Sequence, residues 1–403
     1  MGTAQRRSGA WGASGRPIQL NGEALPFLDG LVVVASDTTI VSLDCAGRRL
    51  WEAVQAGCTE DDLIGACVEH GGLPIEVARA HVSSALESWR AFGLIGRPDR
   101  DTAATPVVTP VLRRSPGCTP ALDAVYLVGD RPVRVRCDDV ALGAVIDAAC
   151  GSCRVEDSAG APAHVVVDVI AQDDGLAVRA DDAALARAEA VTPNRALARH
   201  RCLTALLEMA RPSRQWLGIL HACAIGVRGR CVVFPGAKGA TKSTLGAALV
   251  AAGAEFVTDD YAPLEQGTWH VWPVPYAPGI KRGSWHALRP RYPDLDEQPV
   301  YELAGSHIRY LKLDASRMAP LSRGLPVEAL VFPRFDPGAT VEQRRIPATE
   351  TLVELCDASS MLDRRPEFLA ETLRWIESVP AYQLIYGDLD RAVERLLPLL
   401  RLV

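Results

Sequence analysis

One stretch of this chain, residues 231–249, constrains its fold more than any other. It reads CVVFPGAKGATKSTLGAAL: an apolar run of strand type, a turn with two glycines, and a helix opened by Lys242 and Ser243. Backbone N–H groups of such a turn and the positive end of the helix dipole point at one place, which suits phosphate. Lys242 is expected to reach the outer phosphates and Ser243 to bind Mg²⁺. The residues expected to form this loop are Gly236, Ala237, Lys238, Gly239, Ala240, Thr241, Lys242, Ser243 and Thr244.

The stretch departs at one position from the G-x-x-x-x-G-K-[ST] pattern of phosphate-binding loops. Thr241 stands where the second glycine belongs. A β-branched residue at positive φ costs about 1–2 kcal/mol and pushes its side chain toward the ligand. The alternative is an ordinary strand–turn–helix corner with a solvated lysine.

Polar residues flank two further apolar strands near this loop. Residues 255–258 end in Asp259 and Asp260, and His221 opens residues 222–227. A carboxylate at a strand end beside a phosphate site can bind the metal or take the proton of an attacking hydroxyl. Each feature is weak alone, because Asp-Asp pairs are common in turns and a lone histidine is more often structural. Together with the loop they form an ordered set.

This set resembles the HPr kinase/phosphorylase family of P-loop kinases, which phosphorylate a serine hydroxyl on a protein. The resemblance covers roughly residues 120–403 and has no gaps between His221 and Asp260. It implies ATP as phosphate donor, Asp259 as the catalytic base and His221 as its orienting partner. It also implies Mg²⁺ bound by Ser243 with Asp260 or Asp259, while the family's further metal-binding glutamate has no evident counterpart.

Residues 275–285, PYAPGIKRGSW, instead resemble diverged HPr kinase-related proteins. In this segment Lys281 is expected either to contact a phosphate or the acceptor, or to be a solvated lysine on a loop. Residues 330–338 and 382–388 also look like the closing strands of those relatives.

The N-terminal part carries a different pattern. Residues 31–35 and 39–43 are rich in β-branched side chains and predict a hairpin. Helices are expected over residues 47–55, from Thr59 with a capping box to Asp62, and over residues 74–92. The apolar face expected for the third helix is Val77, Ala80, Val82, Ala85, Leu86 and Trp89. A hairpin with three short helices is typical of a winged-helix-like module.

Residues 43–51, 59–63 and 92–95 resemble PqqD-like domains, which hold leader peptides in ribosomal peptide natural-product pathways. The resemblance implies that a leader adds as a strand to the sheet edge and packs on the third helix, which is β-augmentation. The alternatives are a winged helix that binds nucleic acid or one that only packs on the kinase. Mixed charge on the third helix, with Glu76 and Arg79 close together, argues against nucleic acid.

Composition limits the function classes further. The chain has 403 residues, of which 48% are hydrophobic, and a net charge of −6. Such a chain can bury sizeable cores in two or three domains, and its acidic balance argues against general binding to nucleic acid or anionic membranes. It has no apolar run of membrane-spanning length and no secretory signal, so a cytoplasmic location is expected.

The chain has eleven cysteines, an odd number. Most lie in apolar runs and are expected to be reduced and buried. The cysteines in such apolar runs include Cys67, Cys202, Cys223, Cys231 and Cys356. The pair Cys150 and Cys153 is expected to mark a helix end and loop rather than a zinc site, because no second pair is suitably spaced.

These patterns predict a mobile tail over residues 1–25, a PqqD-like domain over 26–96, a proline-rich linker over 97–120 and an HPr kinase-like domain over 121–403. The predicted fold class is an α/β P-loop kinase domain preceded by a small α+β winged-helix-like domain. The second domain is expected to begin with strands and to continue with a helix over residues 195–209. The strands are expected at 124–128, 133–136, 164–170 and 175–179.

The function expected from these parts is ATP-dependent phosphorylation of a serine or threonine in a precursor peptide whose leader the N-terminal domain holds. Three alternatives remain: a small-molecule hydroxyl kinase, a leader-binding scaffold with a weak nucleotide site, and a nucleotide-gated DNA-binding regulator. The pattern also leaves open whether the chain forms homo-oligomers.

Overall fold

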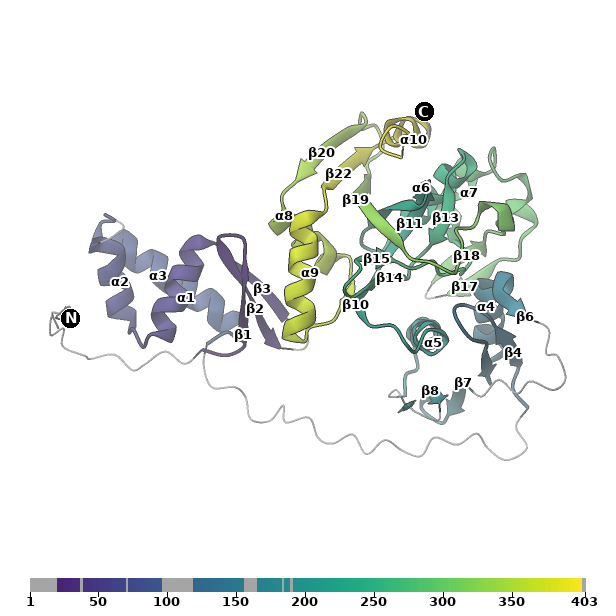
Figure 1. The fold of residues 1–403 in the computed structure, drawn as a ribbon, viewed down its shortest axis with the longest axis horizontal. Coiled ribbons are helices and arrows are strands. Elements are labelled where there is room, and N and C mark those ends of the chain that lie inside the picture. Colours follow the sequence, from purple (N-terminus) through teal and green to yellow (C-terminus); the bar gives the residue numbers. More distant parts are fainter. Residues whose placement is uncertain are drawn as a thin grey trace. The chain divides into compact units, whose positions relative to one another are not determined.

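The computed structural model describes residues 20–36, 39–69, 72–95, 119–155, 165–182, 185–188, 191–303 and 305–400. Within these ranges the protein is mixed α/β, and its strands form four sheets (Figure 1). The chain divides into two units: Met1–Val107 with Arg364–Ala370, and Val108–Asp363 with Glu371–Val403. Residues 1–19 of the predicted tail and residues 97–118 of the predicted linker lie outside the described residues.

The first unit contains a three-stranded antiparallel sheet in the order β1-β2-β3. Its strands are β1 (Glu23–Phe27), β2 (Gly30–Ser36) and β3 (Thr39–Leu43). The β2–β3 pairing confirms the predicted hairpin. Strand β1 was not expected, and Leu20 already forms a bridge with Ile95. The predicted tail over residues 1–25 is therefore too long at its C-terminal end.

Three helices follow the sheet, as predicted: α1 (Cys45–Gln55), α2 (Glu60–Glu69) and α3 (Ile75–Ala91). Helix α1 starts two residues earlier than expected, because the Asp44 carboxylate accepts a hydrogen bond from the Gly47 N–H at 2.8 Å. The capping box of α2 is confirmed. Thr59 N–H donates to Asp62 at 2.8 Å, and Asp62 N–H donates to Thr59 Oγ1 at 3.3 Å.

The buried face of α3 differs from the predicted one. Val77 is 51% exposed and Ala80 is also exposed, so both were wrongly assigned to the apolar face. Val82, Leu86 and Trp89 are buried as predicted, and Ala78 is buried in place of Val77. Trp89 packs edge-on against Trp51 with ring centroids 5.5 Å apart. The buried residues of α3 are Ala78, Val82, Leu86 and Trp89.

The second unit begins with a six-stranded sheet in the order β6-β4-β5-β7-β8-β9. Its strands are β4 (Leu122–Tyr126), β5 (Val133–Cys137), β6 (Arg154–Val155), β7 (Val166–Gln172), β8 (Gly175–Asp182) and β9 (Leu185–Ala188). The predicted strands correspond to β4, β5, β7 and β8, and the predicted helix corresponds to α5 (Arg195–Ala210). Of helix α4 (Val140–Cys150), only the C-terminal end at Cys150 was expected. Cys150 ends it and Cys153 ends the short turn that follows, as predicted for this pair.

A ten-stranded sheet forms the centre of the second unit. Its main path runs β13-β11-β12-β19-β15-β14-β10-β21, with β22 also beside β19 and β20 beside β22. Strand β12 is parallel to β19, which is parallel to β22. The bounds are β10 (Trp216–Leu220), β11 (Ala222–Val227), β12 (Arg230–Pro235), β13 (Glu255–Thr258), β14 (Ala262–Glu265), β15 (His270–Val271), β19 (Leu325–Phe335), β20 (Glu342–Ile346), β21 (Met361–Leu362) and β22 (Ala381–Tyr386). Strands β19 and β22 overlap residues 330–338 and 382–388, where strands were expected.

Helices and a small third sheet complete the second unit. Side chains of α6 (Lys242–Ala251) and α10 (Leu389–Leu396) share one core with β11, β12, β19 and β22. The small sheet has the order β16-β18-β17. Its strands are β16 (Gly279–Lys281), β17 (Tyr301–Leu303) and β18 (Ser306–Tyr310), and helices α7 (Trp285–Leu288) and α8 (Ala348–Asp357) also belong to the second unit. Helix α9 (Pro366–Ser378) begins in the segment assigned to the first unit, Arg364–Ala370, and ends in the second unit.

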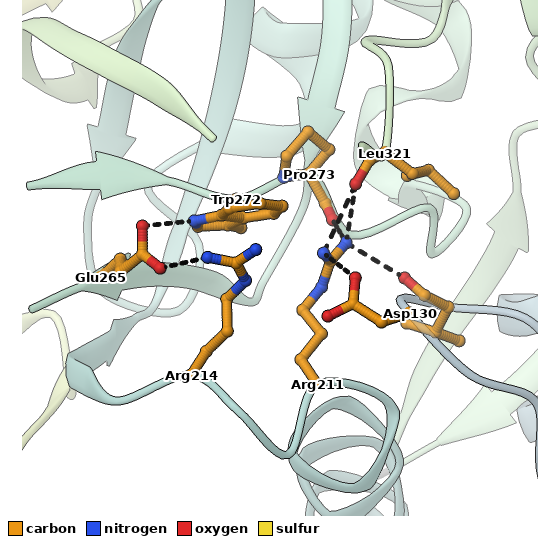
Figure 2. A network of polar contacts seen from close by, with 8 residues as sticks. Asp130, Arg211, Arg214, Glu265, Trp272, Pro273 and Leu321 are labelled. Atoms are coloured by element: carbon orange, nitrogen blue, oxygen red, sulfur yellow. Dashed lines mark hydrogen bonds and ion pairs between the residues drawn. The ribbon is translucent and has the colours of Figure 1, made fainter. Parts of the chain in front are cut away.

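Two arginines around Trp272 connect the end of α5 to the central sheet (Figure 2). Arg211, whose side chain is fully buried, points at backbone carbonyls and donates to Pro273 O at 3.0 Å. Arg214 stacks on the Trp272 ring at 3.6 Å and pairs with Glu265, which also accepts from Trp272 Nε1 at 2.9 Å. Because the buried charges are paired and hydrogen-bonded, this network can hold α5 against β14 and β15.

The cysteines follow the expected burial in part. Cys202, Cys223 and Cys231 are buried as predicted. Cys67 is half-buried and Cys356 is exposed, so the prediction was wrong for these two. In the part of the chain that the structure describes, no helix combines the length and apolarity needed to cross a membrane.

Candidate functional site

Antiparallel pairing brings the predicted site residues to one edge of the central sheet. Strand β11 pairs with β12 on one side and β13 on the other, both antiparallel. The start of β11 therefore lies beside the ends of its neighbours, with Ala222 opposite Pro235 and Ala224 opposite Thr258. This edge therefore carries His221, the loop that follows β12, and Asp259 and Asp260, which follow β13.

Two glycines, one in the loop between β12 and α6 and one in α6 itself, allow neighbouring parts of the chain to lie very close together. A Cβ atom at Gly236 would lie 2.9 Å from the Ala240 Cβ, which is too close for an unshifted side chain. A Cβ at Gly246 would lie 2.3 Å from Cys223 Sγ, so this glycine lets α6 pack directly on β11. Helix α6 begins at Lys242, as predicted from the sequence. Its N-terminus is thereby fixed at the sheet edge.

Thr241 adopts the left-handed conformation expected of the glycine it replaces, with φ 64°. Its hydroxyl donates to Ala240 O at 2.5 Å and lies 2.6 Å from Tyr386 Oη on β22. The single hydroxyl proton is used on the carbonyl, so the Tyr386 hydroxyl donates to Thr241. The strain of the left-handed conformation is thus offset by two hydrogen bonds that glycine could not make.

Lys242 is buried, with 5% of its surface exposed. Its Nζ donates to Gly236 O at 2.6 Å and lies 3.4 Å from His221 Nε2. Burial lowers the pKa of Lys242, and the charges of Asp260 and Asp259 oppose that shift. The alternative of a corner with a solvated lysine is therefore wrong: the ammonium group is held inside the loop.

The two consecutive carboxylates have different partners. Asp259 is 3% exposed and accepts a hydrogen bond from Ser243 Oγ at 3.0 Å. Burial raises the pKa of Asp259 to about 7, and the charge of Asp260 adds to the effect. Asp260 has a φ of 64° and a side chain that is 37% exposed. Burial acts to raise its pKa, but the hydrogen bond to His221 and the charge of Arg199 hold the pKa of Asp260 low.

His221 contacts Asp260, not Asp259. Its Nδ1 lies 2.8 Å from Ala358 O and must carry the proton that this carbonyl accepts. Its Nε2 faces Asp260 Oδ1 at 3.4 Å and can donate to this carboxylate when the ring carries a second proton. The predicted pairing of His221 with Asp259 is therefore corrected, because the left-handed backbone at Asp260 gives the two carboxylates different directions.

A cavity of about 430 Å³ lies at this edge and gathers most of the predicted site. Lys281 lies in its wall on β16, not on an open loop. The predicted residues that line the cavity are His221, Lys238, Gly239, Thr241, Lys242, Ser243, Thr244, Asp260 and Lys281. The predicted residues that do not line it are Gly236, Ala237, Ala240 and Asp259. The carboxylate that can meet a substrate is therefore that of Asp260.

Part of the cavity lining was not predicted from the sequence. Arg199 and His200 of α5 and Tyr310 of β18 belong to this part. His200 stacks on Tyr261 and its Nδ1 lies 3.1 Å from the Tyr261 hydroxyl. One sequence signal existed, because Arg199 and His200 are polar residues in the N-terminal half of α5, close to its buried residues Ala198 and Cys202. The distance along the chain to the loop hid its meaning.

The oxygen ligands at the loop fit Mg²⁺ only together with phosphate. Among the described residues, no three His, Cys, Asp or Glu side chains gather as a metal site. Ser243 Oγ and Asp259 Oδ1 are 3.0 Å apart, beside Asp260. Mg²⁺ is commonly bound by one or two carboxylates plus the phosphates of a substrate. This donor set matches that pattern.

No protein-family model matches this chain, and no curated protein matches it. The function must therefore be argued from the cavity and its residues.

Proposed function

We propose that this protein is an ATP-dependent kinase, related to the HPr kinase/phosphorylase family, that phosphorylates a serine or threonine hydroxyl of a ribosomally made precursor peptide. One observation carries the proposal. A phosphate-type loop with a buried lysine and a histidine-paired carboxylate share one cavity. Phosphoryl transfer needs these parts, because catalysis rests on positioning and charge stabilisation.

Each side chain has a role that its contacts support. The loop amides and Lys242 would bind the triphosphate, with Lys242 leaving the Gly236 carbonyl for a phosphate oxygen. Ser243 and Asp259 would hold Mg²⁺, which neutralises charge on the phosphates when it is bound. Asp260, held by His221, would take the proton of the acceptor hydroxyl. The hydroxyl oxygen bonds to the γ-phosphorus as the bond to ADP breaks.

Nucleotide binding is tested by calorimetry with ATP and magnesium. We expect measurable heat for the wild type and a large loss of affinity for Lys242→Ala. Lys238→Ala is the matched control, because Lys238 belongs to the same loop but is exposed. Its effect should be smaller. If the folded wild type gives no heat with any purine nucleotide, the proposal fails.

The first unit supplies the proposed peptide partner site. We propose a PqqD-like role, in which a leader peptide adds as a strand to its sheet. The described sheet has β1 and β3 at its edges, and β3 leads directly into the helices. Main-chain hydrogen bonds would set the register of the peptide, and side-chain pockets would select it.

A leader-binding scaffold with a weak nucleotide site is the second candidate. The positive φ of Thr241 and the bond from Lys242 to the loop carbonyl favour it. Mass spectrometry of a precursor peptide encoded beside this gene separates the two candidates. A mass gain of one phosphate on a hydroxyl after incubation with ATP supports the kinase. An unchanged peptide, with ATP bound, supports the scaffold.

A further inference from the structure

Arg199 projects from α5 and lines the cavity, together with residues of the β12–α6 loop and the start of α6. Its guanidinium carbon lies 5.9 Å from the centre of the Tyr310 ring on β18. The sequence pattern gives this arginine no role, and in the site described above it acts only through its charge on Asp260.

The surroundings of Arg199 leave hydrogen-bonding capacity unused. Its Nε is buried and has no hydrogen-bond partner among the described residues. Tyr310 lies beside it, His200 is engaged with Tyr261, and Asp260 is near enough for its charge to attract the guanidinium. A guanidinium carries five donors and is costly to bury without acceptors. The site therefore suits a ligand that brings oxygen acceptors.

A second cation lies on the same wall. Lys281 of β16 pairs across the sheet with Ile308, two residues before Tyr310 on β18. Side chains two apart on a strand share one face, and Lys281, Ile308 and Tyr310 all line the cavity. Asp260 is the carboxylate among the cavity-lining residues, and His221 already contacts it. The wall therefore has positive charge beyond what the nucleotide loop contributes.

We propose that Arg199 and Lys281 form an anion subsite on the acceptor side of the cavity. The acceptor would then carry an oxyanion, a carboxylate or a phosphate, close to the hydroxyl that is phosphorylated. This inference rests on the proposed kinase function and narrows its substrate class. Arginine suits the role because its planar donors bind either group in a bidentate manner.

The test uses the full chain saturated with Mg²⁺ and the non-hydrolysable analogue AMP-PNP, so that the loop is filled. Inorganic phosphate is titrated in one arm and acetate in the other, with binding followed by ligand-observed NMR. We expect saturable binding of at least one anion. Arg199→Gln should weaken it by about tenfold or more, since Arg–anion pairs are among the strong hydrogen bonds. Preference for phosphate or for acetate identifies the group that the acceptor carries.

Arg201→Gln is the matched control, because Arg201 lies on the same helix but does not line the cavity. It should bind the anion as the wild type does. Lys281→Gln, on a short edge strand, gives a second reading of the subsite if Arg199→Gln fails to fold, and it should also weaken binding. Anion binding that is absent in the wild type, or unchanged in both subsite variants, overturns the inference.

Failure of the kinase proposal gives a different result. If AMP-PNP does not bind, the proposed function is wrong. The same anion titration is then made without nucleotide in the Lys242→Ala background, where the loop has lost its lysine. Loss of binding on adding Arg199→Gln supports the subsite in that case, and equal binding contradicts it.

Discussion

At the scale of single residues, Thr241 shows how the β12–α6 loop tolerates a residue other than glycine at a position of positive φ. Glycine would adopt the positive φ without strain, whereas threonine pays about 1–2 kcal/mol for it. Two hydrogen bonds, one to Ala240 and one from Tyr386, offset that strain. The Tyr386 hydroxyl depends on Thr241, because Tyr386 is 1% exposed.

We predict that Thr241→Val lowers the free energy of unfolding by about 1–3 kcal/mol, because a buried hydroxyl loses its partner. Thr241→Gly should stay within about 1 kcal/mol of the wild type, since relief of strain offsets the same loss. Denaturant unfolding measures both. In the Tyr386→Phe background, Thr241→Val should cost less. Equal costs in both backgrounds would show that the pair is not coupled.

Kinetic measurements should distinguish the roles of the Asp259 and Asp260 carboxylates. We predict that Asp260→Asn lowers the rate of phosphoryl transfer with little change in nucleotide affinity, because Asp260 faces the cavity. Asp259→Asn should raise the magnesium concentration needed for half-maximal activity, because Asp259 contacts Ser243. Transfer rates measured across a magnesium titration check both. The reverse pattern would restore Asp259 as the base.

The sequence was sufficient to predict which residues lie close together in the site, but not the directions in which their side chains point. The spacing of His221, Lys242 and Asp259 along three strand ends predicted their proximity, because hairpin pairing follows from short turns. It could not show which carboxylate meets the substrate, since this depends on the φ of Asp260. Arg199 was missed for a similar reason: its contact with β18 spans more than a hundred residues and has no local pattern.

At the scale of elements, α5 matters because it positions Arg199 and His200 in the cavity wall. Its N-terminus is capped by Asn194, whose Oδ1 accepts from Ala196 N–H at 2.9 Å and Leu197 N–H at 3.2 Å. We predict that Asn194→Ala costs about 1 kcal/mol of stability and Asn194→Gly only a few tenths. Thermal and denaturant unfolding of the two variants measure this. An equal loss in both would place the role of Asn194 outside the cap.

The elements that the sequence predicted poorly have no clear hydrophobic periodicity. Helix α4, VALGAVIDAAC, is apolar on most sides, so no amphipathic period marks it. Strand β1, EALPF, is short and contains Pro26, which is normally a sign against a strand. It lies at the sheet edge, where proline is tolerated. Strongly patterned elements such as α3 and β12 were predicted close to their observed bounds.

At the scale of the whole molecule, the network in Figure 2 connects α5 to the central sheet. It should make the stability of the second unit depend on pH in the acidic range. Burial acts to raise the pKa of Glu265, but hydrogen bonds from Thr268, Trp272 and Arg214 hold that pKa below its usual range. A lowered folded-state pKa means stability that is present above the unfolded-state pKa and is lost as pH falls through the folded-state value.

We predict that Glu265→Gln lowers the free energy of unfolding by about 1–3 kcal/mol at neutral pH. The difference from the wild type should begin to shrink as pH falls below about 4.5, where the unfolded-state carboxylate takes up its proton, and should be lost once pH falls below the lowered folded-state pKa. Denaturant unfolding between pH 3 and 7 measures it, at roughly one-unit intervals. Glu394→Gln, at an exposed position, is the control and should change little. A difference independent of pH would remove the charge of Glu265 from the explanation.

The division into two units gives a prediction for the proposed function. Deletion of residues 1–96 should weaken phosphorylation of the full precursor and leave nucleotide binding intact, because the loop, Lys242 and Asp260 belong to the second unit. Steady-state kinetics with full and leader-less peptides measure it. If the intact protein uses both peptides equally well, the first unit does not hold the leader.

The contact between the hydroxyls of Tyr386 on β22 and Thr241 in the loop could be used to monitor the cavity by spectroscopy. Tyr386 touches Thr241 directly, yet it belongs to a strand near the end of the described chain. A fluorinated tyrosine at this position would sense any rearrangement of the loop through its phenolic oxygen. Its fluorine resonance could then report nucleotide arrival in real time, without a label on either substrate.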